Sequence, residues 1–110
     1  MALLTTAQVL QGGTTVTLSA ASGGGDTMVC SQGSFLMVTN GGGSPITVTI
    51  TAVGTLPYGV TYPALTVSVT NATTKLIGPI SDTFFKNASD GYAHIGYSGV
   101  TTVTVGAFSV

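Results

Sequence analysis

The sequence predicts an all-β protein, folded as a single-domain antiparallel β-sandwich of about seven or eight short strands, jelly-roll-like or immunoglobulin-like. Three observations predict this fold. Apolar residues alternate with Thr or Ser in several segments, as in strands that bury one face. Clusters of Gly, Asn, Ser and Pro separate these segments at intervals of about 8–12 residues. No segment carries a sustained apolar period of about 3.6 residues, so long helices are not expected.

The expected strands follow one another along the chain. The alternation is unbroken in residues 46–51 and 65–70, which places Ile, Val and Leu on one face and Thr or Ser on the other. Residues 16–18 and 103–105 repeat the pattern towards the two ends of the chain. Residues 35–38 are continuously apolar, which suggests a central strand covered on both faces.

Two short connections are predicted to close hairpins. Residues 41–45, Gly-Gly-Gly-Ser-Pro, follow one predicted strand directly and lead into the next. Residues 98–99, Ser-Gly, lie between the predicted strands at 92–97 and 100–108. Each pair of flanking strands is therefore expected to lie side by side in one sheet.

Two stretches do not fit the strand pattern. Residues 54–63 are rich in Pro, Gly and Tyr and are predicted to form a surface loop. Residues 81–86 are predicted to form one helical turn, with Ser81 as its N-cap and Asp82 at the positive end of the helix dipole.

The domain organisation is expected to be simple, with the sandwich formed by residues 13–110. Gly12 and Gly13 set off residues 1–12, which carry several apolar side chains. This segment is either an N-terminal arm that pairs with the sheet edge of a neighbouring chain or an ordinary first strand. The segment lacks the basic region of a signal peptide, and no apolar run approaches the length of a membrane span, so we expect no membrane partner. A lone cysteine fits synthesis in a reducing cytoplasm.

The composition favours a protein that works in an assembly. Charged residues make up 5% of the chain, against about 25% in ordinary soluble domains. Hydrophobic residues make up 44%, so the chain has enough apolar surface to fold. A weakly charged surface promotes association and is unusual for a freely diffusing enzyme. Two lysines without any arginine cannot form a phosphate-binding cluster, so nucleic acid is not an expected partner.

No residue pattern points to catalysis, a cofactor or a metal. His94 is the only histidine, and Asp90 and Ser98 lie four residues to either side. A strand over residues 92–97 would hold both about 13 Å from the imidazole, so no triad is expected. Cys30 has no partner cysteine and is interpreted as a small, semi-buried apolar residue. The glycine runs lack the lysine and the following helix of a phosphate-binding loop, and no carboxylates have the spacing of a calcium loop.

Five apolar or aromatic residues are candidates for contact with a partner. Leu3, Leu4 and Val9 belong to the N-terminal segment, and Tyr58 and Tyr62 to the predicted loop. The tyrosines either fold back onto their own sandwich or insert into a neighbouring subunit, where aromatic side chains often dominate binding.

Three stretches carry a resemblance to a known family: residues 34–49 (SFLMVTNGGGSPITVT), residues 75–79 (KLIGP) leading into Phe84 and Phe85, and residues 97–105 (YSGVTTVTV). In their order and spacing they resemble small all-β head proteins of tailed phages of actinobacteria. The resemblance implies a capsid decoration, or cement, protein on the outer surface of the virion head. It implies the major capsid protein as partner and self-association, for which a trimer is expected, and it carries no catalytic residues.

The sequence therefore predicts a virion structural protein that stabilises the head and is not an enzyme. Two alternatives remain open. One is a tail, neck or head-completion protein of the same virion. The other is a carbohydrate- or host-surface-binding module, for which Tyr58, Tyr62 and Asn71 would supply aromatic and amide groups.

Overall fold

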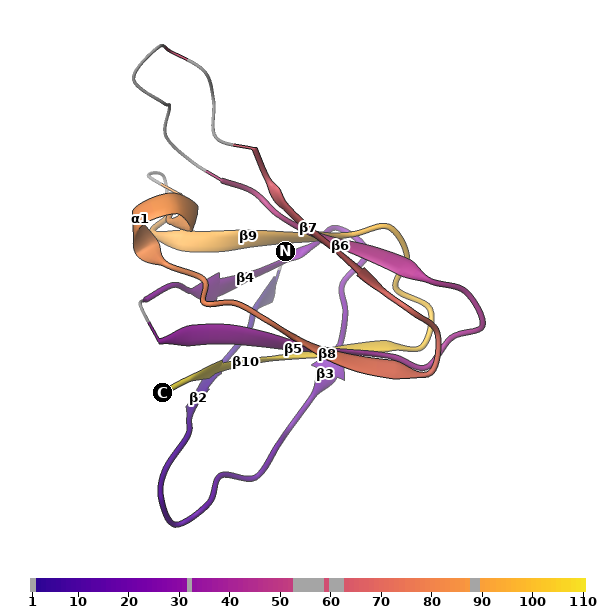
Figure 1. Ribbon diagram of the computed structural model, residues 1–110, viewed down its shortest axis with the longest axis horizontal. Coiled ribbons are helices and arrows are strands. Elements are labelled where there is room, and N and C mark those ends of the chain that lie inside the picture. The colour runs from indigo at the N-terminus through magenta and orange to yellow at the C-terminus, as the bar shows by residue number, and fades with distance from the viewer. Residues whose placement is uncertain (1, 32, 53–58, 60–62, 88–89) are drawn as a thin grey trace.

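The computed structural model describes residues 2–31, 33–52, 59, 63–87 and 90–110. Within them the chain forms ten strands and one helical turn (Figure 1). The elements in chain order are β1 (Ala2–Leu3), β2 (Thr6–Gln8), β3 (Ser19–Ala20), β4 (Asp26–Val29), β5 (Ser34–Asn40), β6 (Ile46–Ile50), β7 (Leu65–Val69), β8 (Thr73–Ile77), α1 (Asp82–Phe85), β9 (Tyr92–Tyr97) and β10 (Val103–Ser109).

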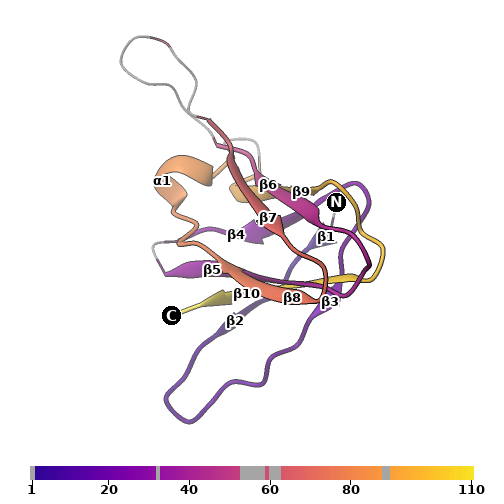
Figure 2. The ribbon, with the colours of Figure 1, turned by 45° about the vertical axis from the view of Figure 1, so that its right-hand side comes forward.

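The strands form two stacked sheets, which confirms the predicted all-β sandwich. One sheet, called sheet A, has the order β1-β4-β9-β6-β7, and the other, sheet B, has the order β2-β10-β5-β8, with β3 also paired to β10. Figure 1 shows β4 and β9 in one layer above β5 and β10 in the other, and the rotated view in Figure 2 keeps the layers apart.

The pairing scheme decides between the two predicted sandwich types. β6 pairs with β7, β5 with β8, β4 with β9 and β3 with β10, all antiparallel. The first half of the chain is thus nested against the second half, and successive pairs alternate between the two sheets. This is the arrangement of a jelly roll, built from eight strands in two Greek keys.

The core lies between the sheets and follows the alternation in the sequence. In β6, Ile46, Val48 and Ile50 point inward and are buried, whereas Thr47 between them is exposed. The alternation that predicted a strand over residues 46–51 is therefore confirmed. The largest fully buried apolar side chains come from both sheets and from the β8–α1 connection: Met28, Leu36, Val38, Val48, Ile50, Val69, Ile80, Ile95, Val103 and Val105.

The two predicted hairpins are wrong. β5 belongs to sheet B and β6 to sheet A, and β9 and β10 are divided in the same way. Both connections cross between the layers because each strand pairs with its counterpart from the other half of the chain. Buried Asn40 stabilises the first crossing: its amide donates to the carbonyls of Ser44 and Val69, and its oxygen accepts from the amide of Gly42.

Two further predictions about strands need correction. Residues 16–18 do not form a strand; the strand that follows them, β3, covers only Ser19–Ala20 and pairs with β10. The adjacent edge of β10 is already occupied by β2, so residues 16–18 run past it as part of a long loop. β5 is central in sheet B, but it is not covered on both faces: Phe35 and Met37, which point outward, are only half-buried.

The N-terminal segment connects the two sheets. β1 runs parallel to β4 in sheet A, and β2 runs parallel to β10 in sheet B. Leu4, between them, is buried in the core. At the other end of the sequence, the predicted helical turn is present as α1, where the amide of Phe85 donates to the carbonyl of Ser81.

Candidate interaction surface

An apolar area covers the outer face of sheet B. Strand register brings Phe108 of β10 opposite Phe35 of β5, and Met37 of β5 opposite Leu76 of β8. The rings of Phe35 and Phe108 stack with their centroids 5.7 Å apart. These four side chains point away from the core, where the alternation elsewhere in the sandwich places Thr or Ser.

The loop between β2 and β3, residues 9–18, forms the opposite side of this area. The loop is held by Thr14, whose hydroxyl accepts from the amide of Leu10 at 2.9 Å and donates to the carbonyl of Gln8 at 2.8 Å. Gly13 adopts a φ of 97° and donates its amide to the carbonyl of Leu10, which closes the turn. A left-handed backbone of this kind favours glycine, so this turn depends on the residue type at position 13.

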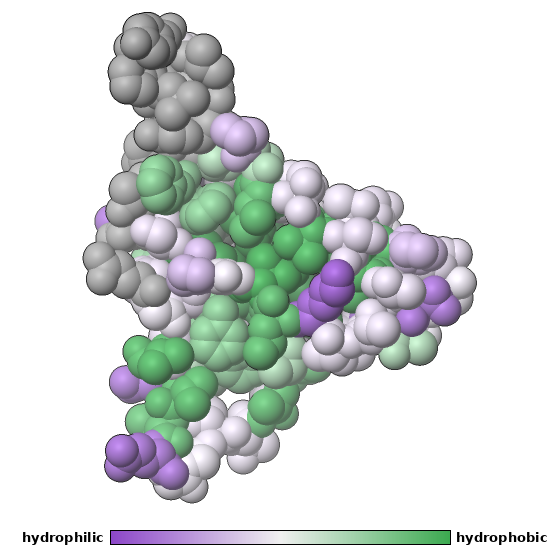
Figure 3. All heavy atoms as spheres, in the orientation of Figure 1, coloured by the Kyte–Doolittle hydropathy of each residue, from purple (hydrophilic) through white to green (hydrophobic). Residues whose placement is uncertain are grey.

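Between the loop and the strands lies a groove of about 270 Å³, called the outer groove below. No charged side chain is among the described residues that line it, which are Val9, Leu10, Gly13, Thr14, Val16, Phe35, Met37, Leu76 and Phe108. The most exposed of its apolar side chains are Leu76 (63%), Leu10 (57%) and Val16 (54%). In Figure 3 green, apolar residues extend from the centre of this face into its lower part, where white residues and a purple tip border them.

Exposed apolar side chains that are scattered singly are normal on a protein surface. In the outer groove they are gathered into one concave area on a rigid sheet. Gathered patches of this kind mark sites of interaction with proteins or other apolar partners. The outer groove is therefore the candidate functional site.

The structure places the predicted contact residues in different environments. Val9 lines the outer groove, and Leu3 is exposed on β1. Leu4 is 7% exposed and packs in the core of its own chain. Tyr58 and Tyr62 lie outside the described residues.

Most of the groove was not predicted from the sequence. The signal that was available is the run at residues 35–38, because Phe35 and Met37 occupy positions that would carry Thr in a strand with one solvated face. Leu76 and Val16 give no comparable signal, because their place beside β5 depends on pairing between distant parts of the chain.

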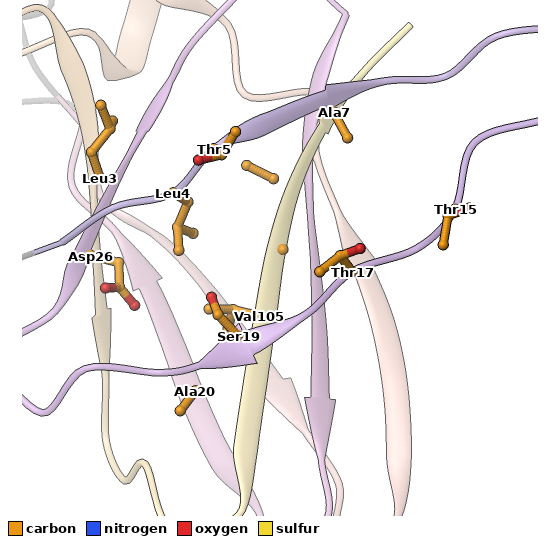
Figure 4. Close-up of a pocket in the computed structure, with 12 residues that line it drawn as sticks. Leu3, Leu4, Thr5, Ala7, Thr15, Thr17, Ser19, Ala20, Asp26 and Val105 are labelled. Atoms are coloured by element: carbon orange, nitrogen blue, oxygen red, sulfur yellow. The ribbon is translucent and has the colours of Figure 1, made fainter.

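A second hollow lies beneath the N-terminal segment. It has a volume of about 520 Å³. It is lined by Leu3, Leu4, Thr5 and Ala7 on one side and by Thr15, Thr17, Ser19 and Ala20 on the other (Figure 4). Asp26 of β4 borders it and is 1% exposed.

Asp26 is a buried carboxylate that is only partly satisfied by hydrogen bonds. Its Oδ2 atom accepts from the hydroxyl of Tyr97 at 2.8 Å and from the amide of Ser22 at 3.3 Å. Its Oδ1 atom and the buried Thr6 Oγ1 have no hydrogen-bond partner among the described residues. Burial, together with the hydrogen bond to the Asp26 carboxylate, raises the pKa of the Tyr97 hydroxyl well above its ordinary value.

The prediction that Asp90 cannot reach His94 is wrong. Asp90 Oδ2 lies 2.8 Å from His94 Nε2. The chain turns at Gly91, where φ is 78°, and Asp90 Oδ1 accepts from the amide of Tyr92 at 3.0 Å, which directs the carboxylate back along the strand. The hydrogen bond from Tyr92 is the main cause that lowers the pKa of Asp90, and the bond with His94 adds to it.

Ser98 does not join this pair. Its hydroxyl oxygen accepts from the amide of Thr47 at 2.8 Å, at the opposite end of β9. The three residues therefore do not form a catalytic triad. Cys30 is buried, 8% exposed, as expected for a small apolar residue.

Within the described residues, no group of three or more His, Cys, Asp or Glu side chains is placed to hold a metal ion. The one helical turn in the same part of the chain is too short to cross a membrane.

No protein-family model, curated protein or solved structure matches this chain. The outer groove is therefore assigned as the candidate site from its geometry alone.

Proposed function

We propose that this chain is a structural protein of a phage virion, a decoration protein that binds the outside of the head through the outer groove. The observation that carries the proposal is the gathering of exposed apolar side chains on the outer face of sheet B in a chain with very few charges. The resemblance of residues 34–49, 75–79 and 97–105 to phage head proteins supports the same role. The jelly roll adds only an analogy, because viral capsid domains and lectins both use it.

The partner in this proposal is the major capsid protein. Burying apolar surface contributes roughly 25 cal/mol per Å², so the half-exposed Leu10, Val16 and Leu76 each have free energy to contribute on docking. The lining carries no charge that would have to be desolvated. A protein that binds the assembled shell and not its separated subunits stabilises the shell by mass action.

The proposal is tested by placing a charge in the groove. Leu76 points outward from β8 and is 63% exposed, so Leu76→Asp leaves the core intact, and its free energy of unfolding should stay within about 0.5 kcal/mol of the parent. On docking, the new carboxylate would be buried without a partner. We expect its affinity for purified heads lacking this protein to fall by at least about tenfold, measured by co-sedimentation.

Thr66→Asp is the matched control. Thr66 is also an exposed strand residue, but it lies on β7 of the other sheet. The control should bind heads as the parent does. Equal binding by Leu76→Asp and the parent would contradict docking through the outer groove, and failure of the parent to bind heads would contradict the decoration role itself.

A further inference from the structure

The N-terminal segment is attached to the sandwich through very short pairings. β1 pairs with β4 over two residues, and β2 pairs with β10 over three, both in parallel. Both strands lie at the edges of their sheets. The eight strands β3 to β10 already complete the jelly roll, so the fold does not need residues 2–8 to close either sheet.

The packing beneath this segment is poor. The hollow of about 520 Å³ lies directly below it, and Leu4 is its one buried apolar side chain among residues 3–10. Two buried polar atoms, Thr6 Oγ1 in the segment itself and Asp26 Oδ1 beside the hollow, have no partner among the described residues. Buried polar atoms without hydrogen bonds and few apolar contacts both lower the free energy needed to detach a segment locally.

The segment is followed by a glycine pair that is suited to act as a hinge. Residues 11–13 are exposed. A Cβ atom added at Gly12 or Gly13 would meet no other atom within 4 Å, so the backbone there has free space around it. A change of backbone angles at this pair would redirect the preceding residues without disturbing β3.

The edges of β4 and β10 therefore form a binding site for residues 2–8 of this sequence. We propose that copies of the protein exchange this segment, so that β1 and β2 of one molecule pair with β4 and β10 of a neighbour. The β1–β4 and β2–β10 pairings of the closed form are recreated between the two molecules, and the turn between Leu10 and Gly13 opens. Exchange of an identical element is a low-cost route to oligomers, and open chains of such exchanges would link neighbouring copies on a surface.

The experiment uses cross-linking between Gln8 and Ser109, which lie opposite each other in the β2–β10 pair. Both are accessible positions outside the core. In a Cys30→Ala background, which removes the native thiol, one sample carries only Gln8→Cys and a second carries only Ser109→Cys. The two full-length proteins are mixed, incubated at high concentration and oxidised, and the cysteine-linked peptides are identified by mass spectrometry.

An exchanged segment places position 8 of one molecule against position 109 of another. We therefore expect the 8–109 disulfide to exceed the disulfide formed by random collision by at least about tenfold. The control mixture combines Thr39→Cys and Thr74→Cys, which face each other between β5 and β8 inside the jelly roll and cannot exchange without unfolding. An 8–109 yield no higher than the 39–74 yield would overturn the proposal.

A chain that carries both Gln8→Cys and Ser109→Cys gives a second reading. At low protein concentration the disulfide between positions 8 and 109 should form within one molecule. At high concentration it should join different molecules and give covalent oligomers. Closure within one molecule at every concentration would also count against exchange. These measurements use the isolated protein, so their outcome does not depend on the proposed virion role.

Discussion

Asp26 and Tyr97 show how a buried charge is accommodated in this small core. The carboxylate is 1% exposed and accepts a hydrogen bond from Tyr97, 71 positions further along the chain. In the sequence Asp26 directly follows three glycines, which gives no indication that the aspartate points inward. The Asp90–His94 pair was missed for a related reason, because the turn at Gly91 shortens a distance that strand geometry alone makes long. Side-chain pairs of this kind depend on local backbone turns and on strand pairing between distant segments. Neither can be predicted from the alternation of apolar and polar residues.

The Tyr97–Asp26 bond predicts a dependence of stability on alkaline pH. The pKa of Tyr97 is raised in the folded state above its ordinary value of 10.0, so the folded protein holds this proton more tightly than the unfolded chain. Its contribution to stability is complete below about pH 10 and is lost as the pH rises further towards the folded-state pKa. We expect the free energy of unfolding to fall above pH 10, measured by urea denaturation at a series of pH values.

Tyr97→Phe should remove much of that fall. At neutral pH the variant should be less stable by about 1–3 kcal/mol, because the buried Asp26 loses a donor. Tyr92→Phe, at the opposite end of β9, is the control and should keep the alkaline slope. The interpretation fails if Tyr97→Phe declines with pH as steeply as the parent.

At the scale of elements, alternation predicted several of the strands, but it was wrong for residues 16–18 and did not predict which strands pair. Residues 46–51 and 65–70 became β6 and β7, which do pair with each other. The hairpins expected at 41–45 and 98–99 are crossings between sheets instead. A short glycine-rich connection is compatible with either geometry, and the choice depends on β8 and β4, which lie far away in the sequence. The outer groove has the same origin, because the loop at residues 9–18 is placed by β10.

Gly106 of β10 marks where that loop passes closest to the sheet. A Cβ atom there would lie 2.8 Å from Leu18 Cδ2 and 3.0 Å from the carbonyl oxygen of Thr17. Gly106→Ala therefore forces the loop away from β10 and should destabilise the protein by about 1–3 kcal/mol, seen as a lower Tm in thermal unfolding. Gly24→Ala, where the added Cβ meets nothing within 4 Å, should unfold as the parent does. Equal Tm values for the two variants would show that the loop does not rest on β10 as described.

At the scale of the whole molecule, composition and architecture lead to the same account. The chain has few charges and many apolar residues. Burying its surface against another protein therefore costs little desolvation free energy. The sandwich concentrates exposed apolar side chains on sheet B and leaves the N-terminal segment loosely attached at the edges. The sequence was sufficient to predict the sandwich, and a role in an assembly stays a prediction. The sequence was not sufficient to predict the outer groove, because the groove is assembled from β5, β8, β10 and the loop at residues 9–18, which meet only in the folded chain.

The proposed decoration role is tested most directly by the amount of this chain in purified particles of the phage proposed to encode it. Densitometry of separated virion proteins gives its molar ratio to the major capsid protein. Decoration through the outer groove predicts a ratio near one copy per capsid subunit. A few copies per particle, as in a neck or tail ring, or absence from the particle would contradict it.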